Sequence, residues 1–322
     1  MISVVMAVYN GEKFIDKQLN SIVNQSKVPD EIVITDDSDN ENTYLIIKKY
    51  IENYKDIRWV YIKNDKRLGY THNFFKAISA SSGDIVFLSD QDDVWEYRKI
   101  ELMSSCINDD KSISCLCCKY KYIDKNGNRI SNVHKYTTSL KYYLKSITSK
   151  YFRLDKKEYF KILAFPGMCF AITRELINDL NNILDKADID NIKFHDLIIS
   201  YIAARNNNFY ICNEALCRYR MHGDNAIGVN DFNNKSKQDR VEWLSNILQN
   251  QIDINKIERT FDNSDANDNL IMLNDLINFN NKRLSALKCK NVSKLLSLMF
   301  GINNYLSIKS YIGDFLYIIR NE

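Results

Sequence analysis

Ile85-Val86-Phe87-Leu88-Ser89-Asp90-Gln91-Asp92-Asp93 joins a short apolar run to three closely spaced carboxylates. A continuous apolar run of this length, ended by polar residues, is typical of a strand buried on both faces of a parallel sheet. Similar runs occur at residues 2–8, 31–35 and 58–62, and stretches with apolar residues at helical spacing separate them. Strands that alternate with helices predict an α/β fold with βαβ units, a mostly parallel sheet and helices on both of its faces.

The sequence beyond residue 100 is less regular. The patterns predict a strand (114–123), a turn (124–128), loops or short helices (134–160), a strand introduced by 165–169, a helix (192–204), two short strands (209–211 and 215–220) and helices from 237 onward. The polar stretch 262–269 is predicted to link two of those helices.

Composition and charge exclude several classes of protein. The 322 residues are 45% hydrophobic, which allows a sizeable core, and 44 Lys and Arg against 41 Asp and Glu leave a net charge of only +3. A charge so close to neutral, with no long basic run, argues against a nucleic-acid partner. The sequence shows no signal peptide and no apolar segment long enough to span a bilayer. We therefore expect a cytoplasmic protein that can still contact the inner face of the cell membrane.

The eight cysteines are predicted to be reduced, because a chain of this size needs no disulfide framework. Cys115, Cys117 and Cys118 crowd one apolar stretch and could suggest a metal site. No second CxxC or HxxxH cluster completes such a site, so buried structural thiols are favoured.

The acidic loop 90–93 is the strongest candidate for chemistry. Alternate residues of an extended chain point the same way, so Asp90 and Asp92 can face one ion. Carboxylate oxygens suit Mg²⁺ or Mn²⁺, which keep open positions for phosphate oxygens and would neutralise charge on a departing nucleotide diphosphate. The alternative is that these acids cap a helix spanning residues 95–103.

Polar residues also follow the first two strands, at Tyr9-Asn10 and Asp36-Asp37. In parallel sheets ligands bind outside the carboxyl ends of the strands, so the three clusters are predicted to share one site. Asp36 or Asp37 can accept hydrogen bonds from a base or ribose, or can belong to an ordinary turn and N-cap. The first strand is not followed by GxGxxG, and the chain has no GxxxxGK[ST], which argues against a nicotinamide dehydrogenase and a P-loop NTPase.

Two later segments offer further polar chemistry. Asp196, beside His195 at a predicted helix start, could act as a general base on a hydroxyl, or could be an N-cap. Arg218-Tyr219-Arg220-Met221-His222-Gly223-Asp224-Asn225 could contact a diphosphate or a metal, or could form a surface loop. No GxSxG and no Cys/His arrangement indicates an enzyme nucleophile.

Taken in order, these segments resemble the family 2 glycosyltransferases of GT-A fold, and among them the bacterial rhamnosyltransferase-type enzymes of surface-polysaccharide assembly. The resemblance covers roughly residues 1–230. The matching stretches are Val4 to Gly11, Gln18 to Ser26, Ile34 to Ser38, Leu68 to Phe74, Gly83 to Trp95, His195-Asp196 and Tyr219 to Asn225. The resemblance implies a nucleotide-sugar-binding half (1–125) and an acceptor-binding half (126–230) of one GT-A domain, followed by a C-terminal helical region (231–322).

The same resemblance implies a donor pocket for a nucleoside-diphosphate sugar, such as a UDP- or dTDP-sugar. Asp37 or Asp36 would read the base. The other residues that it assigns to the donor are Ala7, Tyr9, Glu12, Asn73, Asp90, Gln91 and Arg220.

For the metal and the reaction, the resemblance implies that Asp90 and Asp92 form a DxD element for Mn²⁺ or Mg²⁺, with Asp93 nearby. His222 would lie by the diphosphate or bind the metal. Asp196 would be the base that deprotonates the acceptor hydroxyl for a single in-line displacement, which inverts the anomeric centre and needs no nucleophile. The acceptor would be a growing glycan carried on a polyprenyl lipid, and rhamnose or another hexose the sugar.

The sequence departs from the family pattern at Asp36 to Glu41, which bears on the ribose contacts, and at Pro166 to Cys169, which lacks a Thr that the acceptor-side stretch often has. Two rival functions stay open at this point: a sugar nucleotidyltransferase and a non-catalytic GT-A-fold partner. The apolar tail, with Lys294, Lys309 and Arg320 interspersed, could lie on a membrane, pack on the catalytic domain or form a homodimer interface.

Overall fold

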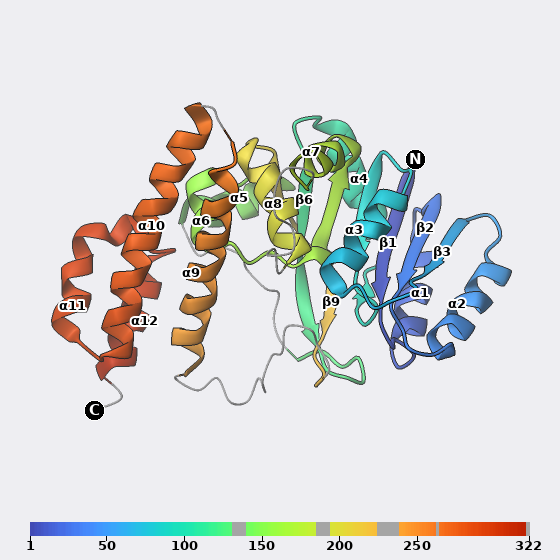
Figure 1. Cartoon of the computed structure of the whole chain (residues 1–322), viewed down its shortest axis with the longest axis horizontal. Helices are drawn as coiled ribbons and strands as arrows, with labels where there is room; N and C mark the ends of the chain where they lie inside the picture. Colours follow the sequence, from blue (N-terminus) through green and yellow to red (C-terminus); the bar gives the residue numbers. More distant parts are fainter. Residues whose placement is uncertain (131–139, 185–193, 224–237, 262–263, 320–322) are drawn as a thin grey trace. The chain divides into compact units, whose positions relative to one another are not determined.

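The structure is a computed structural model that describes residues 1–130, 140–184, 194–223, 238–261 and 264–319. The chain forms two compact units (Figure 1). The sheet unit comprises Met1–Lys135, Ser146–Arg153 and Phe165–Asn225, and the helical unit comprises Tyr136–Lys145, Leu154–Ala164 and Ala226–Glu322.

The sheet unit is built on one mixed sheet in the order β3-β2-β1-β4-β8-β6-β9-β5, with β7 paired to β9. β1 pairs in parallel with β2 and β4, β2 with β3, and β6 with β9, whereas the β4–β8, β6–β8, β5–β9 and β7–β9 pairs are antiparallel. The strands are β1 (Ile2–Val8), β2 (Glu31–Asp36), β3 (Arg58–Lys63), β4 (Ile85–Ser89), β5 (Val94–Trp95), β6 (Cys115–Ile123), β7 (Tyr151–Arg153), β8 (Phe170–Thr173) and β9 (Phe209–Arg220).

Helices connect the strands, and α3 packs against β1 and β2 (Figure 1). The helices of the sheet unit are α1 (Ile15–Val23), α2 (Asn42–Asn53), α3 (Tyr70–Ala80), α4 (Lys99–Asp109), the 3₁₀ turn η1 (Gly167–Cys169), α7 (Arg174–Leu184) and α8 (His195–Arg205). α5 (Leu140–Thr148) crosses the boundary between the units. The predicted α/β class with a mostly parallel sheet is therefore confirmed.

The buried strands agree with the apolar runs that predicted them. β1, β2 and β4 are buried along almost their whole length, because neighbours on both sides and helices leave no face for water. Three predictions differ from the structure. Residues 134–160, predicted as loops or short helices, also contain the strand β7, which pairs with β9. Residues 209–211 and 215–220 belong to one strand, β9, which crosses the polar residues between them with irregular pairing to β6. The stretch 262–269 is mostly not a linker, since α10 begins at Ser264.

The register of the sheet brings distant strand ends to one edge. Val8 is opposite Asp36, and Met6 is opposite Ser89, so the residues after β1, β2 and β4 all emerge at the same edge. β8 runs antiparallel to both β4 and β6, and β9 runs parallel to β6, so β9 also ends at this edge, at Arg220. This is where the predicted polar clusters lie.

The helical unit has its own apolar core and contains α6 (Lys156–Ile162), α9 (Gln238–Glu258), α10 (Ser264–Lys288), α11 (Val292–Ser297), the 3₁₀ segment η4 (Leu298–Asn304) and α12 (Ile308–Ile319). Its core includes Leu244, Phe279, Leu295 and Ile318. The fully buried Asp314 is paired with Arg283 at 2.5 Å and with Arg240. Among the described residues, none of the helices combines the length and apolar character needed to cross a bilayer.

Candidate active site

The acidic loop leaves β4 at the shared edge and places three carboxylates together. Oxygens of Asp90, Asp92 and Asp93 lie within 4.8 Å of one another. The loop continues into the short strand β5, and α4 begins only at Lys99, with Arg98 at its N-cap position. The carboxylates therefore do not cap the helix that was their alternative explanation.

Charge is crowded in this loop. Asp93 is fully buried; its Oδ1 accepts a hydrogen bond of 2.8 Å from the Arg220 amide, whereas no described residue is a hydrogen-bond partner of its Oδ2. Burial, together with the charges of Asp92 and Asp196, raises the pKa of Asp90 to about 8, and burial with Asp92 and Asp90 raises the pKa of Asp93. A divalent cation would offset this repulsion and could bind Asp93 Oδ2, which has no other described partner. The set of carboxylate ligands therefore fits Mg²⁺ or Mn²⁺.

The end of β9 braces the loop. His222 Nε2 lies 2.9 Å from Asp92 Oδ2. The guanidinium of Arg220 donates from Nε to the Asp92 carbonyl (2.7 Å) and from Nη1 to the carbonyls of Asp124 and Lys125. The ring of Phe14 packs against His222, with 4.6 Å between centroids. Asp224 and Asn225, predicted in the same segment, lie outside the described residues.

Asp196 lies in the first turn of α8, where it is half-buried. Its Oδ2 accepts a hydrogen bond of 3.3 Å from the amide of Gly167 in η1. Burial raises the pKa of this carboxyl to about 6, against the opposing effect of backbone N–H groups. Its charge contributes to the raised pKa of Asp90, so Asp196 and the acidic loop share one electrostatic environment.

The neighbouring His195 is a core residue. Its ring stacks on Phe74 at 4.0 Å between centroids, and neither ring nitrogen has a hydrogen-bond partner among the described residues. Burial lowers the pKa of this imidazole to about 3, so it is neutral. His195 therefore packs α8 against α3 and holds Asp196 at the helix start.

Gln91 links the acidic loop to the end of β1. Its Oε1 accepts from the Tyr9 amide (2.9 Å), and its Nε2 donates to the Tyr9 carbonyl (3.0 Å). A Cβ added at Gly11 would lie 2.4 Å from Gln91 Oε1, so a larger residue there would displace the Gln91 side chain. The sequence assigned Gln91 to the donor, and the structure places it as a brace between two strand ends.

Asp36, Asp37 and Asn73 are buried near the end of β2, and the side chain of Asn64 donates to both Asp37 and Asn73. Asp36 accepts from the Tyr61 hydroxyl at 2.7 Å, and Asp37 Oδ2 accepts from the amides of Leu68 and Gly69 at 3.0 and 2.9 Å. Asn73 donates to the Val8 and Thr35 carbonyls. Asp37 therefore fixes the loop that precedes α3, and Asn73 ties α3 to the ends of β1 and β2.

Comparisons with known proteins identify the family of the chain. The "Glycosyl transferase family 2" model matches residues 3–180. The chain belongs to glycosyl transferase family 2. The dTDP-rhamnosyl transferase RfbG of Shigella flexneri is 30% identical over 248 residues, which are 75% of this chain and 79% of RfbG. The glucosyltransferase WfgD of Escherichia coli, which is named for UDP-Glc and a diphosphoundecaprenol-linked GlcNAc, is 24% identical over 74% of this chain and 83% of its own.

Solved structures identify the fold of the transferase. TarS 1–349 of S. aureus in complex with UDP has a TM-score of 0.54 at 18% identity, over 78% of this chain and 65% of that fragment. The mannosyltransferase PcManGT from Pyrobaculum calidifontis, in complex with GDP-Man and Mn²⁺, has a TM-score of 0.59 at 15% identity, over 99% of this chain and 84% of that chain. The transferase therefore has the predicted GT-A fold, and the predicted family membership is confirmed.

The rim of the transferase's site contains residues that the motifs did not single out. Asp39 accepts a hydrogen bond of 2.9 Å from the Tyr9 hydroxyl, and the guanidinium of Arg67 lies 3.9 Å from the centroid of the Tyr9 ring. Arg67 directly precedes the Leu68-Gly69 motif, which was the available signal. Of the remaining predicted donor residues, Ala7 is half-buried near the end of β1, and Glu12 accepts from Thr43 at 3.2 Å.

Proposed function

We propose that the transferase is a metal-dependent, inverting enzyme that moves a sugar from a nucleoside diphosphate to a glycan hydroxyl in bacterial surface-polysaccharide synthesis. The observation that carries this proposal is that Asp196 is hydrogen-bonded to Gly167 of η1, and η1 packs against β4, the strand that ends in the acidic loop. The charge of Asp196 also helps to raise the pKa of Asp90. A base and an anion-binding cation site must be neighbours if a hydroxyl is to attack the carbon that bears the diphosphate.

Asp90 and Asp92 would hold Mn²⁺ or Mg²⁺, with Asp93 completing the donor set and His222 orienting Asp92. When bound, the ion supplies positive charge that stabilises the diphosphate as it leaves. The Mn²⁺ in the PcManGT complex supports this choice of metal.

Asp196 would accept the proton of the acceptor hydroxyl. The hydroxyl oxygen then bonds to the anomeric carbon while the bond from that carbon to the diphosphate oxygen breaks, and the nucleoside diphosphate leaves from the opposite face. A carboxyl whose pKa lies near 6 is largely ionised at neutral pH, as this role requires.

The donor would lie against Ala7, Tyr9 and Glu12. Asp36 and Asp37, together with Asn73, would shape the subsite for the base. Gln91 would fix the backbone of Tyr9 below the donor. Arg220 would position the acidic loop through its hydrogen bonds to Asp92 and Asp93. RfbG favours dTDP-rhamnose as the donor, and TarS and WfgD favour a UDP-sugar. The nucleotide-binding half would end near residue 125, and residues 126–230 would face the acceptor.

A panel of nucleotide sugars tests the proposal. The purified chain should release nucleoside diphosphate from dTDP-rhamnose or a UDP-sugar only in the presence of Mn²⁺ or Mg²⁺, and the same donor should raise its melting temperature. If no nucleotide sugar and no metal changes either readout, the proposal is wrong.

We also propose that the helical unit brings the enzyme to the inner face of the membrane, where a polyprenyl-linked acceptor would lie. On α12 the exposed residues Ile308, Ile312, Leu316 and Ile319 recur at helical spacing, and Phe300 before it is fully exposed.

The charge around this apolar stripe is positive. Between residues 276 and 319 the only acidic residue is Asp314, which is buried in ion pairs. The exposed cations of this segment are Lys282, Lys288, Lys290, Lys294 and Lys309. An apolar stripe amid positive charge matches an anionic lipid surface.

Vesicle flotation separates this surface from a dimer interface. The full chain should float with vesicles that contain phosphatidylglycerol and should remain below with pure phosphatidylcholine. The Ile312→Gln/Leu316→Gln variant should lose binding, whereas Ile271→Gln, an exposed position on α10, should keep it. The membrane proposal is contradicted if the wild type does not float. If the wild type is then a dimer and the double variant a monomer, the surface is a homodimer interface.

A further inference from the structure

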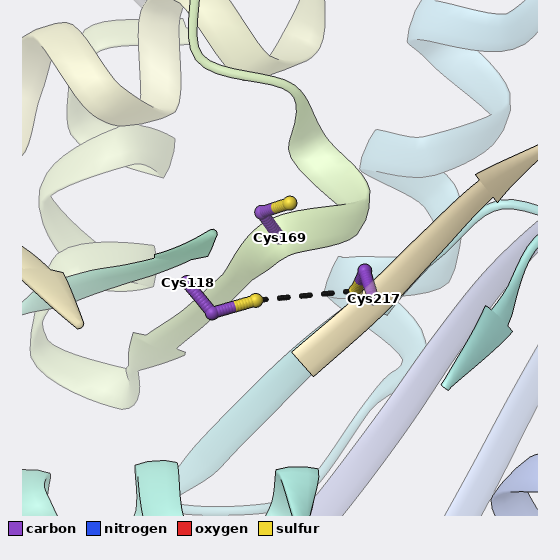
Figure 2. Close-up of side chains that lie close together, drawn as sticks. All are labelled: Cys118, Cys169 and Cys217. Carbon is purple, nitrogen blue, oxygen red and sulfur yellow. Dashed lines mark hydrogen bonds between the residues drawn. The ribbon is translucent and has the colours of Figure 1, made fainter. Parts of the chain in front are cut away.

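Three cysteine thiols meet in the core of the sheet unit. Cys118 comes from β6, Cys169 from η1 and Cys217 from β9, and their side chains lie close together (Figure 2). All three are completely buried. Their sulfur atoms lie within 4.8 Å of one another, with 3.9 Å between Cys118 and Cys217. All eight cysteines of the chain are described, and none is in a disulfide.

The spacing of the sulfur atoms is that of ligands around one ion. A Zn–S bond of about 2.3 Å separates two sulfurs of a tetrahedral site by roughly 3.8 Å. The thioether of Met168 lies 3.8 Å from Cys169 Sγ, so a fourth soft ligand is adjacent. Thiolate and thioether sulfur select ions such as Zn²⁺ and Cu⁺ over the hard cations that suit the acidic loop.

A buried cation beside the thiols favours a divalent ion over a monovalent one. Lys99 Nζ lies 2.9 Å from Cys217 Sγ and 2.6 Å from the Met168 carbonyl, over the ring of Trp95. Three thiolates and a divalent ion carry a net charge of −1, which the ammonium of Lys99 brings to zero. A monovalent ion would leave a net negative charge buried, which is costly.

We propose that Cys118, Cys169 and Cys217 form a binding site for a divalent thiophilic ion of the Zn²⁺ class, beside Lys99 and Met168. The ion would join η1 to β6 and β9. Gly167 in η1 donates to Asp196, and β9 ends at Arg220, which holds the acidic loop. The site would therefore be structural. It would fix η1 and β9, the two segments that position Asp196 and the acidic loop. It is independent of the function proposed above.

Cd²⁺ is the first probe, because its thiolate complexes absorb in the ultraviolet and its carboxylate complexes do not. The full chain is refolded from denaturant with Cd²⁺ or Zn²⁺, since the thiols are buried, and the bound metal is then counted after gel filtration. We expect about one thiolate-bound ion per chain and a higher melting temperature. Cys169→Ser should lose the absorption band and most of the added stability.

Two variants serve as controls. Cys115→Ser changes an equally buried cysteine of β6 outside the cluster and should keep the band. Asp92→Asn should also keep it, which separates this site from the acidic loop. If the wild type shows no band and no bound Zn²⁺, or if oxidation pairs Cys118 with Cys217 while metal stays absent, the proposal is overturned. Because the band is read on the wild type, failure of a variant to fold leaves the test intact.

Discussion

His222 Nε2 lies 2.9 Å from Asp92 Oδ2, although 130 positions separate the two residues in the sequence. The contact ties the segment after β9 to the loop after β4. The acidic loop is therefore held from two sides, by His222 after β9 and by the bonds between Gln91 and Tyr9 after β1. His222 contacts Asp92 but is not one of the three residues whose ligand atoms lie within 4.8 Å of one another, so we infer that it orients a metal ligand.

His222→Ala should therefore weaken metal binding without removing it. Loss of a group that orients a ligand typically lowers metal affinity by about 10–100-fold. Titration of activity with Mn²⁺ measures the effect. Arg218→Ala is the control on the same strand, since Arg218 pairs with Glu96. An unchanged Mn²⁺ requirement in His222→Ala would contradict this role.

Asp196→Asn should abolish transfer and retain donor binding. Removing a general base costs about 10²–10⁴-fold in rate, while the nucleotide, held at the other strand ends, should bind with unchanged affinity. Single-turnover transfer and calorimetric donor titration measure the two effects. Asp179→Asn, a half-buried aspartate on α7, is the matched control and should transfer normally. Lost donor binding in Asp196→Asn would rule out its assignment as the base.

The pH profile should report the same carboxylate. Asp196 must be ionised to accept a proton, and burial raises its pKa to about 6. At saturating Mn²⁺, kcat/KM should therefore rise by about tenfold per pH unit at low pH and level off above about pH 6. A profile that stays flat between about pH 5 and 7 would show that this group does not limit the rate.

Gly11→Ala should destabilise the sheet unit through Gln91. The new Cβ would lie 2.4 Å from Oε1 of the Gln91 side-chain amide, and two hydrogen bonds to the Tyr9 backbone hold that amide in place. We therefore expect a loss of about 1–3 kcal/mol in unfolding free energy. Urea unfolding of Gly11→Ala, Gln91→Ala and the double variant gives the coupling. The double variant should lose less than the sum of the singles, and strict additivity would refute the contact.

The early strands could be predicted from the sequence because a strand buried on both faces needs a continuous apolar run. Residues 85–89 show this most clearly, and the polar residues after them indicated the edge at which a ligand would bind. The family could be predicted for a related reason, since its motifs are short and local. β9 was predicted as two pieces, because pairing to β6 carries it through polar residues that no local pattern marks as strand.

The sequence by itself therefore determined the fold class, the family and the acidic loop, all of which follow from residues close together in the chain. The tertiary structure decided which distant residues meet: His222 with Asp92, Asp196 with Gly167 of η1, and Cys118 with Cys169 and Cys217. It also showed that Asp36, Asp37, Asn73 and Gln91 hydrogen-bond to the protein itself. The reason is physical: strand order and register fix these contacts, and they depend on the packing of the whole sheet.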